Sequence, residues 1–127
     1  MEETAQHAGN QPCWSRRVDK TWGYELWLVN TDKYCAKFLH LAPGYQCSLH
    51  RHPVKDETFL VLKGCCVVEA GAEMRELITG DRQHIAPGTW HRFSNHAETE
   101  CHIFEISTHH SDEDVERRED SRAINGH

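Results

Sequence analysis

Two histidines, a lysine and a glutamate stand close together in the segment LHRHPVKDETFL, residues 49–60. His50 and His52 are two residues apart, so on a β-strand their side chains leave the same face, with Cα atoms about 6.5–7 Å apart. Both imidazoles can therefore converge on one ion. Glu57 can reach the same face if residues 53–56 connect two strands. The histidine pair alone leaves two interpretations open, a metal site or the polar edge of a strand.

A third imidazole is available from His91, which follows the turn formed by residues 87–90 and begins another strand-like run. Three neutral imidazole nitrogens and one carboxylate suit a divalent ion such as manganese, zinc, iron, cobalt or nickel, and manganese is the ion we expect first. Four protein ligands on an octahedral ion leave two positions for substrate or water. Such a site can catalyse a reaction as well as stabilise a fold.

Short runs of β-forming residues make up most of the chain around these side chains. Pairs typical of turns, such as Pro43-Gly44 and Lys63-Gly64, separate the runs. The runs cover residues 24–29, 34–41, 45–52, 57–63, 65–70, 74–78, 82–86, 91–95 and 100–107. Many short strands at about ten-residue spacing predict an all-β protein built as an antiparallel sandwich or barrel.

The two ends of the chain differ from this pattern. Residues 1–15 are polar and have no apolar period, so we expect a flexible N-terminal arm. Residues 16–110 form the predicted barrel. Residues 111–127 form a charged C-terminal tail, in which Glu113 and Arg117 stand four apart and favour a short helix.

The composition narrows the class of protein. A chain of 127 residues with a formal net charge of −6 is long enough for one compact domain. Its lysines and arginines are scattered, which argues against a nucleic-acid partner. No apolar segment approaches the roughly 20 residues that span a bilayer, and no signal-peptide pattern is present. We therefore expect a cytoplasmic protein without a membrane partner, with its six cysteines reduced.

Two spaced motifs resemble those of the cupin family. The first, from Gly44 to Gly64, agrees with G(x)5HxH(x)4E(x)6G at every spacing. The second, from Gly80 to Asn95, is similar to G(x)5PxG(x)2H(x)3N, with Ala86 in place of the first proline. The resemblance implies a double-stranded β-helix, that is a jelly-roll barrel, and a homodimer. It also implies one divalent metal ion held by His50, His52, Glu57 and His91.

Longer segments resemble cupin sugar isomerases. From Lys20 to Arg122 the segments follow the order found in the C-terminal cupin region of mannose-6-phosphate isomerases. The block HRHPVKDE, which contains Lys55, is similar to the D-lyxose isomerase signature, in which the lysine belongs to the active site and a glutamate on a late strand assists proton transfer. Glu105 is the matching glutamate. The resemblance implies interconversion of an aldose and a ketose, of the D-lyxose/D-xylulose or D-mannose/D-fructose type.

This chemistry assigns tasks to particular side chains. Aldose–ketose conversion moves a proton between C2 and C1 through a cis-enediol, and it needs a Lewis acid, a base and an acid. Glu105 is the predicted base, and Lys55 would stabilise the enediolate oxygen or shuttle a proton. Lys37 shares the parity of the apolar positions in its run, so we expect it to bind the sugar from inside. The likeness of the tail to the isomerase group implies that Asp114 and Arg117 close over the substrate.

Other interpretations stay open. Lys55 could be a solvated loop residue and Glu105 an outward strand residue. Three histidines and a glutamate also serve iron-dependent dioxygenases. A non-catalytic carbohydrate-binding protein would be stabilised by sugar without turnover. For the isomerase and for the carbohydrate-binding protein, the expected partner is a small-molecule sugar or sugar phosphate. The adjacent histidines His109 and His110 are expected at the surface.

Overall fold

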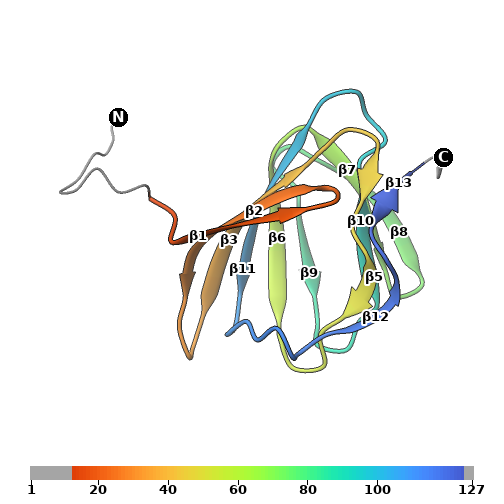
Figure 1. The fold of residues 1–127 in the computed structure, drawn as a ribbon. Helices are drawn as coiled ribbons and strands as arrows, with labels where there is room; N and C mark the ends of the chain where they lie inside the picture. Colours follow the sequence, from red (N-terminus) through yellow and green to blue (C-terminus); the bar gives the residue numbers. More distant parts are fainter. Residues whose placement is uncertain (1–12, 125–127) are drawn as a thin grey trace.

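The computed structural model describes residues 13–124, which form two antiparallel β-sheets that enclose a core (Figure 1). The first sheet has six strands, in the order β1 (Arg16–Lys20), β2 (Gly23–Asn30), β3 (Cys35–Leu41), β11 (Cys101–Ser107), β6 (Glu57–Lys63) and β9 (Arg82–Ile85). The strands β3 and β11 are far apart in sequence but are hydrogen-bonded neighbours in this sheet. Between them the chain crosses to the second sheet and back. This is the arrangement of a jelly roll.

The second sheet has seven strands. Five follow the order β12 (Glu116–Glu119), β5 (Leu49–Arg51), β10 (His91–Ser94), β4 (Tyr45–Gln46) and β13 (Arg122–Ala123). The other two are β7 (Cys65–Ala70), which pairs with β10, and β8 (Glu73–Ile78), which pairs with β7. The predicted all-β jelly roll is confirmed, and each of the nine predicted runs overlaps one or two of the observed strands. The strands β1, β12 and β13 lie outside these runs.

Strict alternation on the central strands decides which side chains face the interior. In β3 every second residue is buried, from Cys35 to Leu41, and β11 follows the same rule. Most interior positions of the first sheet are apolar, including Leu39 and Ile103. Lys37 and Glu105 occupy interior positions opposite each other in the β3–β11 register. At one level of the barrel, two charged side chains therefore interrupt the apolar interior.

The short helix predicted in the charged tail is wrong. Residues 116–119 form β12, which pairs with β5, and residues 122–123 form β13, which pairs with β4. Of the two charges that suggested a helical face, Arg117 belongs instead to this exposed edge strand and Glu113 lies in the turn before it. Glu116 bonds across to Arg51 at 2.6 Å, and Glu119 bonds to Arg92 at 2.7 Å.

Two further expectations concern the whole chain. Within residues 13–124 no helix is present that could cross a membrane. All six cysteines lie within these residues as free thiols. The flexible arm predicted for residues 1–15 lies almost entirely outside the described residues, and so do the last three residues of the predicted tail.

Candidate active site

Three imidazoles converge between the two sheets. His50 lies on β5 and is paired with His91, the first residue of β10, while His52 directly follows β5. The three rings each offer a nitrogen, and these atoms all lie within 4.8 Å of one another. His52 and His91 are buried and His50 is half-buried. The structure thus brings together the three histidines predicted from the sequence.

A hydrogen bond to a backbone carbonyl fixes the tautomer of each ring. Because a carbonyl oxygen only accepts, the ring Nδ1 must carry a proton, and in a neutral ring Nε2 then keeps its lone pair. A neutral imidazole with a free Nε2 is the form that binds a metal ion. The Nδ1 donors and their acceptors are His50 with Ser48 at 2.8 Å, His52 with Asp114 at 2.7 Å and His91 with Thr89 at 2.9 Å.

Burial favours the neutral form of the rings of His50 and His52. It lowers the pKa of His50 to about 3, and the neighbouring His91 adds to the effect. It also lowers the pKa of His52, although the carboxylate of Glu57 opposes the shift. Since a metal ion competes with protons for ring nitrogens, rings that resist protonation are suited to hold one.

Glu57 adds a carboxylate to the cluster. It begins β6 and is 2% exposed, and its Oε2 lies 3.2 Å from Nε2 of His91 and 3.8 Å from Nε2 of His52. Both nitrogens present lone pairs in the tautomers above, and Oε2 has no hydrogen-bond partner among the described residues. Leaving such an acceptor buried is costly. A divalent cation would satisfy it together with the Nε2 atoms, so the donor set fits a metal.

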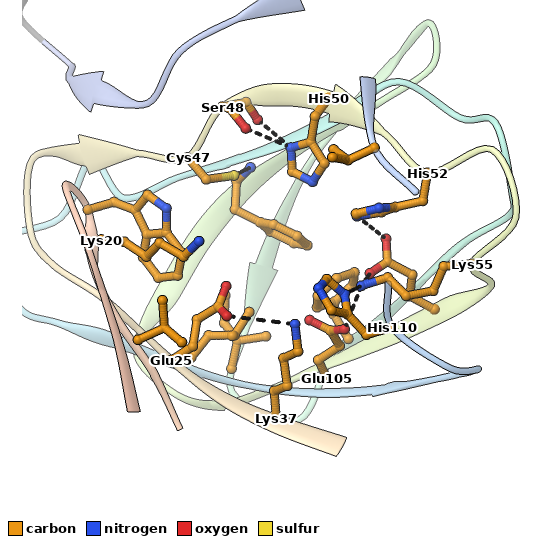
Figure 2. Close-up of a pocket in the computed structure, with 18 of the residues that line it drawn as sticks. Lys20, Glu25, Lys37, Cys47, Ser48, His50, His52, Lys55, Glu105 and His110 are labelled. Atoms are coloured by element: carbon orange, nitrogen blue, oxygen red, sulfur yellow. Dashed lines mark hydrogen bonds and ion pairs between the residues drawn. The ribbon is translucent and has the colours of Figure 1, made fainter. Parts of the chain in front are cut away.

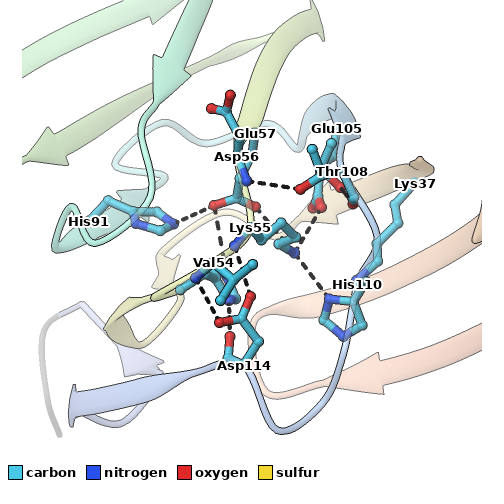
Figure 3. A network of polar contacts seen from close by, with 12 residues as sticks. Lys37, Val54, Lys55, Asp56, Glu57, His91, Glu105, Thr108, His110 and Asp114 are labelled. Carbon is cyan, nitrogen blue, oxygen red and sulfur yellow. Dashed lines mark hydrogen bonds and ion pairs between the residues drawn. The ribbon is translucent and has the colours of Figure 1, made fainter. Parts of the chain in front are cut away.

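Lys55 and Glu105 form a buried ion pair beside this carboxylate (Figure 3). Nζ of Lys55 donates to Oε2 of Glu105 at 3.1 Å and lies 3.3 Å from Oε1 of Glu57. Burial raises the pKa of Glu105 although the charge of Lys55 opposes it. Burial alone would lower the pKa of Lys55, but the carboxylates of Glu105 and Glu57 outweigh it and raise the pKa. The ammonium of Lys55 therefore stays charged, and it lies next to the carboxyl group of Glu105, whose pKa is raised.

A cavity of about 300 Å³ connects these groups with the far side of the barrel. Figure 2 shows the rings of His50 and His52 on one side of this cavity and the Glu25–Lys37 pair on the other. Nζ of Lys37 lies 3.7 Å from Oε1 of Glu25 and 4.1 Å from the ring centre of Trp27. Lys37 is 2% exposed, so its predicted inward orientation is confirmed. Its role in sugar binding stays a prediction.

The two predicted substrate-closing residues lie in different places. Arg117 is exposed and lines the cavity. The carboxylate of Asp114 instead accepts the backbone N–H groups of Val54 and Lys55, at 2.9 and 2.8 Å. Its own carbonyl accepts the Nδ1 proton of His52. We therefore propose that Asp114 supports a metal ligand and the lysine loop, in place of the substrate contact expected from the sequence.

Replacing Asp114 with alanine is expected to lower the free energy of unfolding by about 1–3 kcal/mol, because two backbone donors lose their acceptor. Asp114→Asn keeps one carbonyl oxygen and should lose less. Urea unfolding of the three proteins measures the difference. Glu113→Ala is the matched control, since Glu113 is exposed and its side chain makes no hydrogen bond among residues 13–124. Equal stability of Asp114→Ala and Glu113→Ala would contradict the supporting role.

His110 lines the cavity, so its predicted position at the surface is wrong. Its side chain is 13% exposed, and its Nδ1 lies 3.0 Å from Nζ of Lys55. Burial lowers the pKa of His110 to about 4, and the charges of Lys37 and Lys55 add to the effect. His109 and His110 follow the last long strand, where no alternation shows which ring turns inward. No local signal could have separated them.

The chain belongs to the cupin family, because residues 37–107 match the family model described as a cupin domain. A curated relative, the D-lyxose/D-mannose isomerase of Thermosediminibacter oceani, is 36% identical over 115 residues, with 69% of this chain and 63% of the relative covered. The chain thus spans less than two thirds of that relative's length.

Solved structures agree on the fold. KdgF from a Halomonas species superposes with a TM-score of 0.70 at 20% identity, covering 78% of this chain and 90% of that one. A cupin-superfamily sugar phosphate isomerase from Silicibacter pomeroyi has a TM-score of 0.63 at 19% identity, covering 76% and 75%. At these identities the likeness supports the jelly roll alone.

Proposed function

We propose that this protein is a metal-dependent sugar isomerase that interconverts an aldose and a ketose. The observation that carries the proposal is the buried Lys55–Glu105 pair at the edge of the imidazole cluster. Burying two charges costs several kcal/mol of desolvation before their attraction is counted, so stability alone is a poor reason for the pair. A base and an acid beside a metal site are what the isomerisation requires. The relative named D-lyxose/D-mannose isomerase supports the same reaction.

The chain's own residues account for the proton movements. A bound divalent ion, which we propose to be manganese held by His50, His52, Glu57 and His91, would supply Lewis acidity to adjacent sugar oxygens. Glu105 would remove the proton from C2 of the aldose, and the C–H electron pair would form the C1–C2 double bond of the enediolate. In the same step the π pair of the C1 carbonyl would move to O1. Return of the proton from Glu105 to C1, with transfer of the O2 proton to O1, would give the ketose.

Lys55 would stabilise the negative charge that develops on the sugar oxygen during this step. Its raised pKa keeps it an ammonium, and its place between Glu57 and Glu105 holds the charge close to the reacting carbons. Lys37 and Glu25 would meet sugar hydroxyls across the cavity, because both side chains line it. We propose a free pentose or hexose of the lyxose or mannose type as substrate.

The test is an assay of manganese-loaded protein with lyxose, mannose, xylulose, fructose and the 6-phosphates of the hexoses. Interconversion within at least one aldose–ketose pair is the expected result. Absence of interconversion with all of them would reject the proposal. In that case thermal stabilisation by sugar without turnover would identify a binding protein, and oxygen uptake with Fe(II) would identify a dioxygenase.

We also propose that two copies pair through the outer face of the six-stranded sheet. A row of half-buried apolar side chains crosses four of its strands in register, and it contains Leu26, Phe38, Phe104 and Leu60. Phe104→Glu is expected to give a monomer in sedimentation velocity, because a charge in the contact is strongly unfavourable. Phe104→Leu is the control and should stay dimeric. A wild-type protein that sediments as a monomer would contradict the pairing.

A further inference from the structure

We propose that His110 is a positioning residue that holds the ammonium of Lys55 between Glu57 and Glu105, and that Asp112 fixes the tautomer of His110 needed for this task. The consequence for catalysis rests on the proposed isomerase function. The positioning itself does not, because it follows from contacts that can be tested without turnover.

The first step concerns the three hydrogens of the Lys55 ammonium. Three acceptors surround Nζ, namely Glu105 Oε2 at 3.1 Å, His110 Nδ1 at 3.0 Å and Glu57 Oε1 at 3.3 Å. His110 is the one that carries no charge. Without it, one N–H would lack a partner in a buried site, or the ammonium would shift toward the carboxylates. A shift of this kind changes the distance between the ammonium and the sugar oxygen.

The second step concerns the proton on the ring of His110. Nδ1 can accept from Lys55 only if it carries no proton, so Nε2 must carry it. Nε2 lies 2.9 Å from Oδ1 of Asp112, a carboxylate that can accept this hydrogen. A carboxylate that accepts from one ring nitrogen selects the tautomer and orients the ring, as it does for histidines at metal sites. Asp112 therefore selects the ring form that Lys55 needs.

The third step is that His110 is held in place before any substrate arrives. Its backbone N–H donates to Oδ1 of Asn30, and its carbonyl accepts from Nδ2 of Asn30, both at 3.0 Å. The ring packs edge-on against Trp27, with centroids 4.9 Å apart. A residue whose backbone is bonded to Asn30 and whose ring is held by Trp27 and Asp112 meets the geometric demand of catalysis, in which small misplacements of a group are costly.

The neighbouring histidine provides a matched control. His109 is exposed, and its Nδ1 donates to the carbonyl of Thr31 at 2.7 Å. No hydrogen bond joins it to Lys55 in the described part of the chain. Of these two adjacent histidines, only His110 contacts the ammonium of Lys55.

The kinetic arm of the test compares four proteins loaded with manganese. His110→Leu fills similar space without an acceptor, and kcat is expected to fall about 10- to 100-fold with KM within about twofold, the effect of one lost hydrogen bond to a charged group. His110→Asn can place Oδ1 where Nδ1 stood and should restore most of kcat. His109→Ala should match the wild type. Equal kcat values for His110→Leu and the wild type would overturn the proposal.

The second arm reads the ammonium directly and needs no activity. In zinc-loaded protein with 15N-labelled lysine, the Lys55 ammonium should give a solvent-protected 1H–15N cross-peak, assigned by its loss in Lys55→Met. The cross-peak should persist in His109→Ala and His110→Asn and vanish in His110→Leu, or in His110→Ala if the leucine variant does not fold. A cross-peak unchanged by removal of the acceptor, or absent from the wild type, would overturn the proposal. Correct cross-peaks in a protein that converts no sugar would reject the isomerase function and leave the positioning intact.

Discussion

Replacing Glu105 with glutamine is expected to lower kcat for aldose–ketose interconversion by about 100- to 10,000-fold, the range over which a positioned base contributes to a reaction. Glutamine keeps the volume of the side chain and can still accept a hydrogen bond from Lys55, but it cannot take a proton from C2. Burial already raises the pKa of Glu105, which favours it as a proton acceptor over an exposed carboxylate. Steady-state kinetics of the metal-loaded variant measure the loss.

The control for this variant is Glu100→Gln, the same change at the exposed residue just before β11, which should leave kcat unchanged. The folded state of Glu105→Gln should survive, because Lys55 keeps Glu57 and His110 as partners. Its destabilisation should therefore stay below the 3–5 kcal/mol typical of a buried charge that loses its only partner. Wild-type kcat in Glu105→Gln would remove Glu105 as the base and leave the reaction itself standing.

The interior of the barrel could be predicted from the sequence wherever alternation is regular. Lys37 and Glu105 each stand in a run of alternating apolar residues, so parity alone decides that both face inward. His50 and His52 could be predicted to converge for a related reason, since residues two apart share a face. Glu57 and His91 could be named only as candidates for the same site, because contacts between different strands have no local signal, and the family motifs then supported both.

The supporting residues could not be predicted in the same way. Asp114 reaches back to Val54 and Lys55 from about sixty positions away, through a segment that has no period of its own. His110 lies in the same segment. Its inward orientation depends on bonds from Asn30, 80 residues earlier, to its backbone. Charge was also a poor guide to β12, because an edge strand exposes the same residue types as a solvated helix.

Binding of manganese is expected to raise the melting temperature of the wild type, and His91→Ala is expected to abolish that rise. Oε2 of Glu57 lies 3.2 Å from Nε2 of His91 and has no hydrogen-bond partner among the described residues, and a cation bound by both atoms would make this contact favourable. A ligand present at 1,000 times its Kd stabilises the folded state by about 4 kcal/mol. Differential scanning calorimetry with and without the ion measures the shift.

The quantity to compare is the change in melting temperature that manganese causes within each variant. This is necessary because His91 is 1% exposed and its removal also destabilises the protein without added metal. His96→Ala is the control, since His96 is an exposed histidine outside the cluster and its loss should leave the full shift. An equal shift in His91→Ala and the wild type would place the ion elsewhere. Glu105→Gln should also keep the full shift, because no ion pair joins Glu105 to the four proposed ligands within residues 13–124. If Glu105→Gln loses turnover but keeps the full melting-temperature shift with manganese, the loss is due to the missing base and not to a missing metal ion.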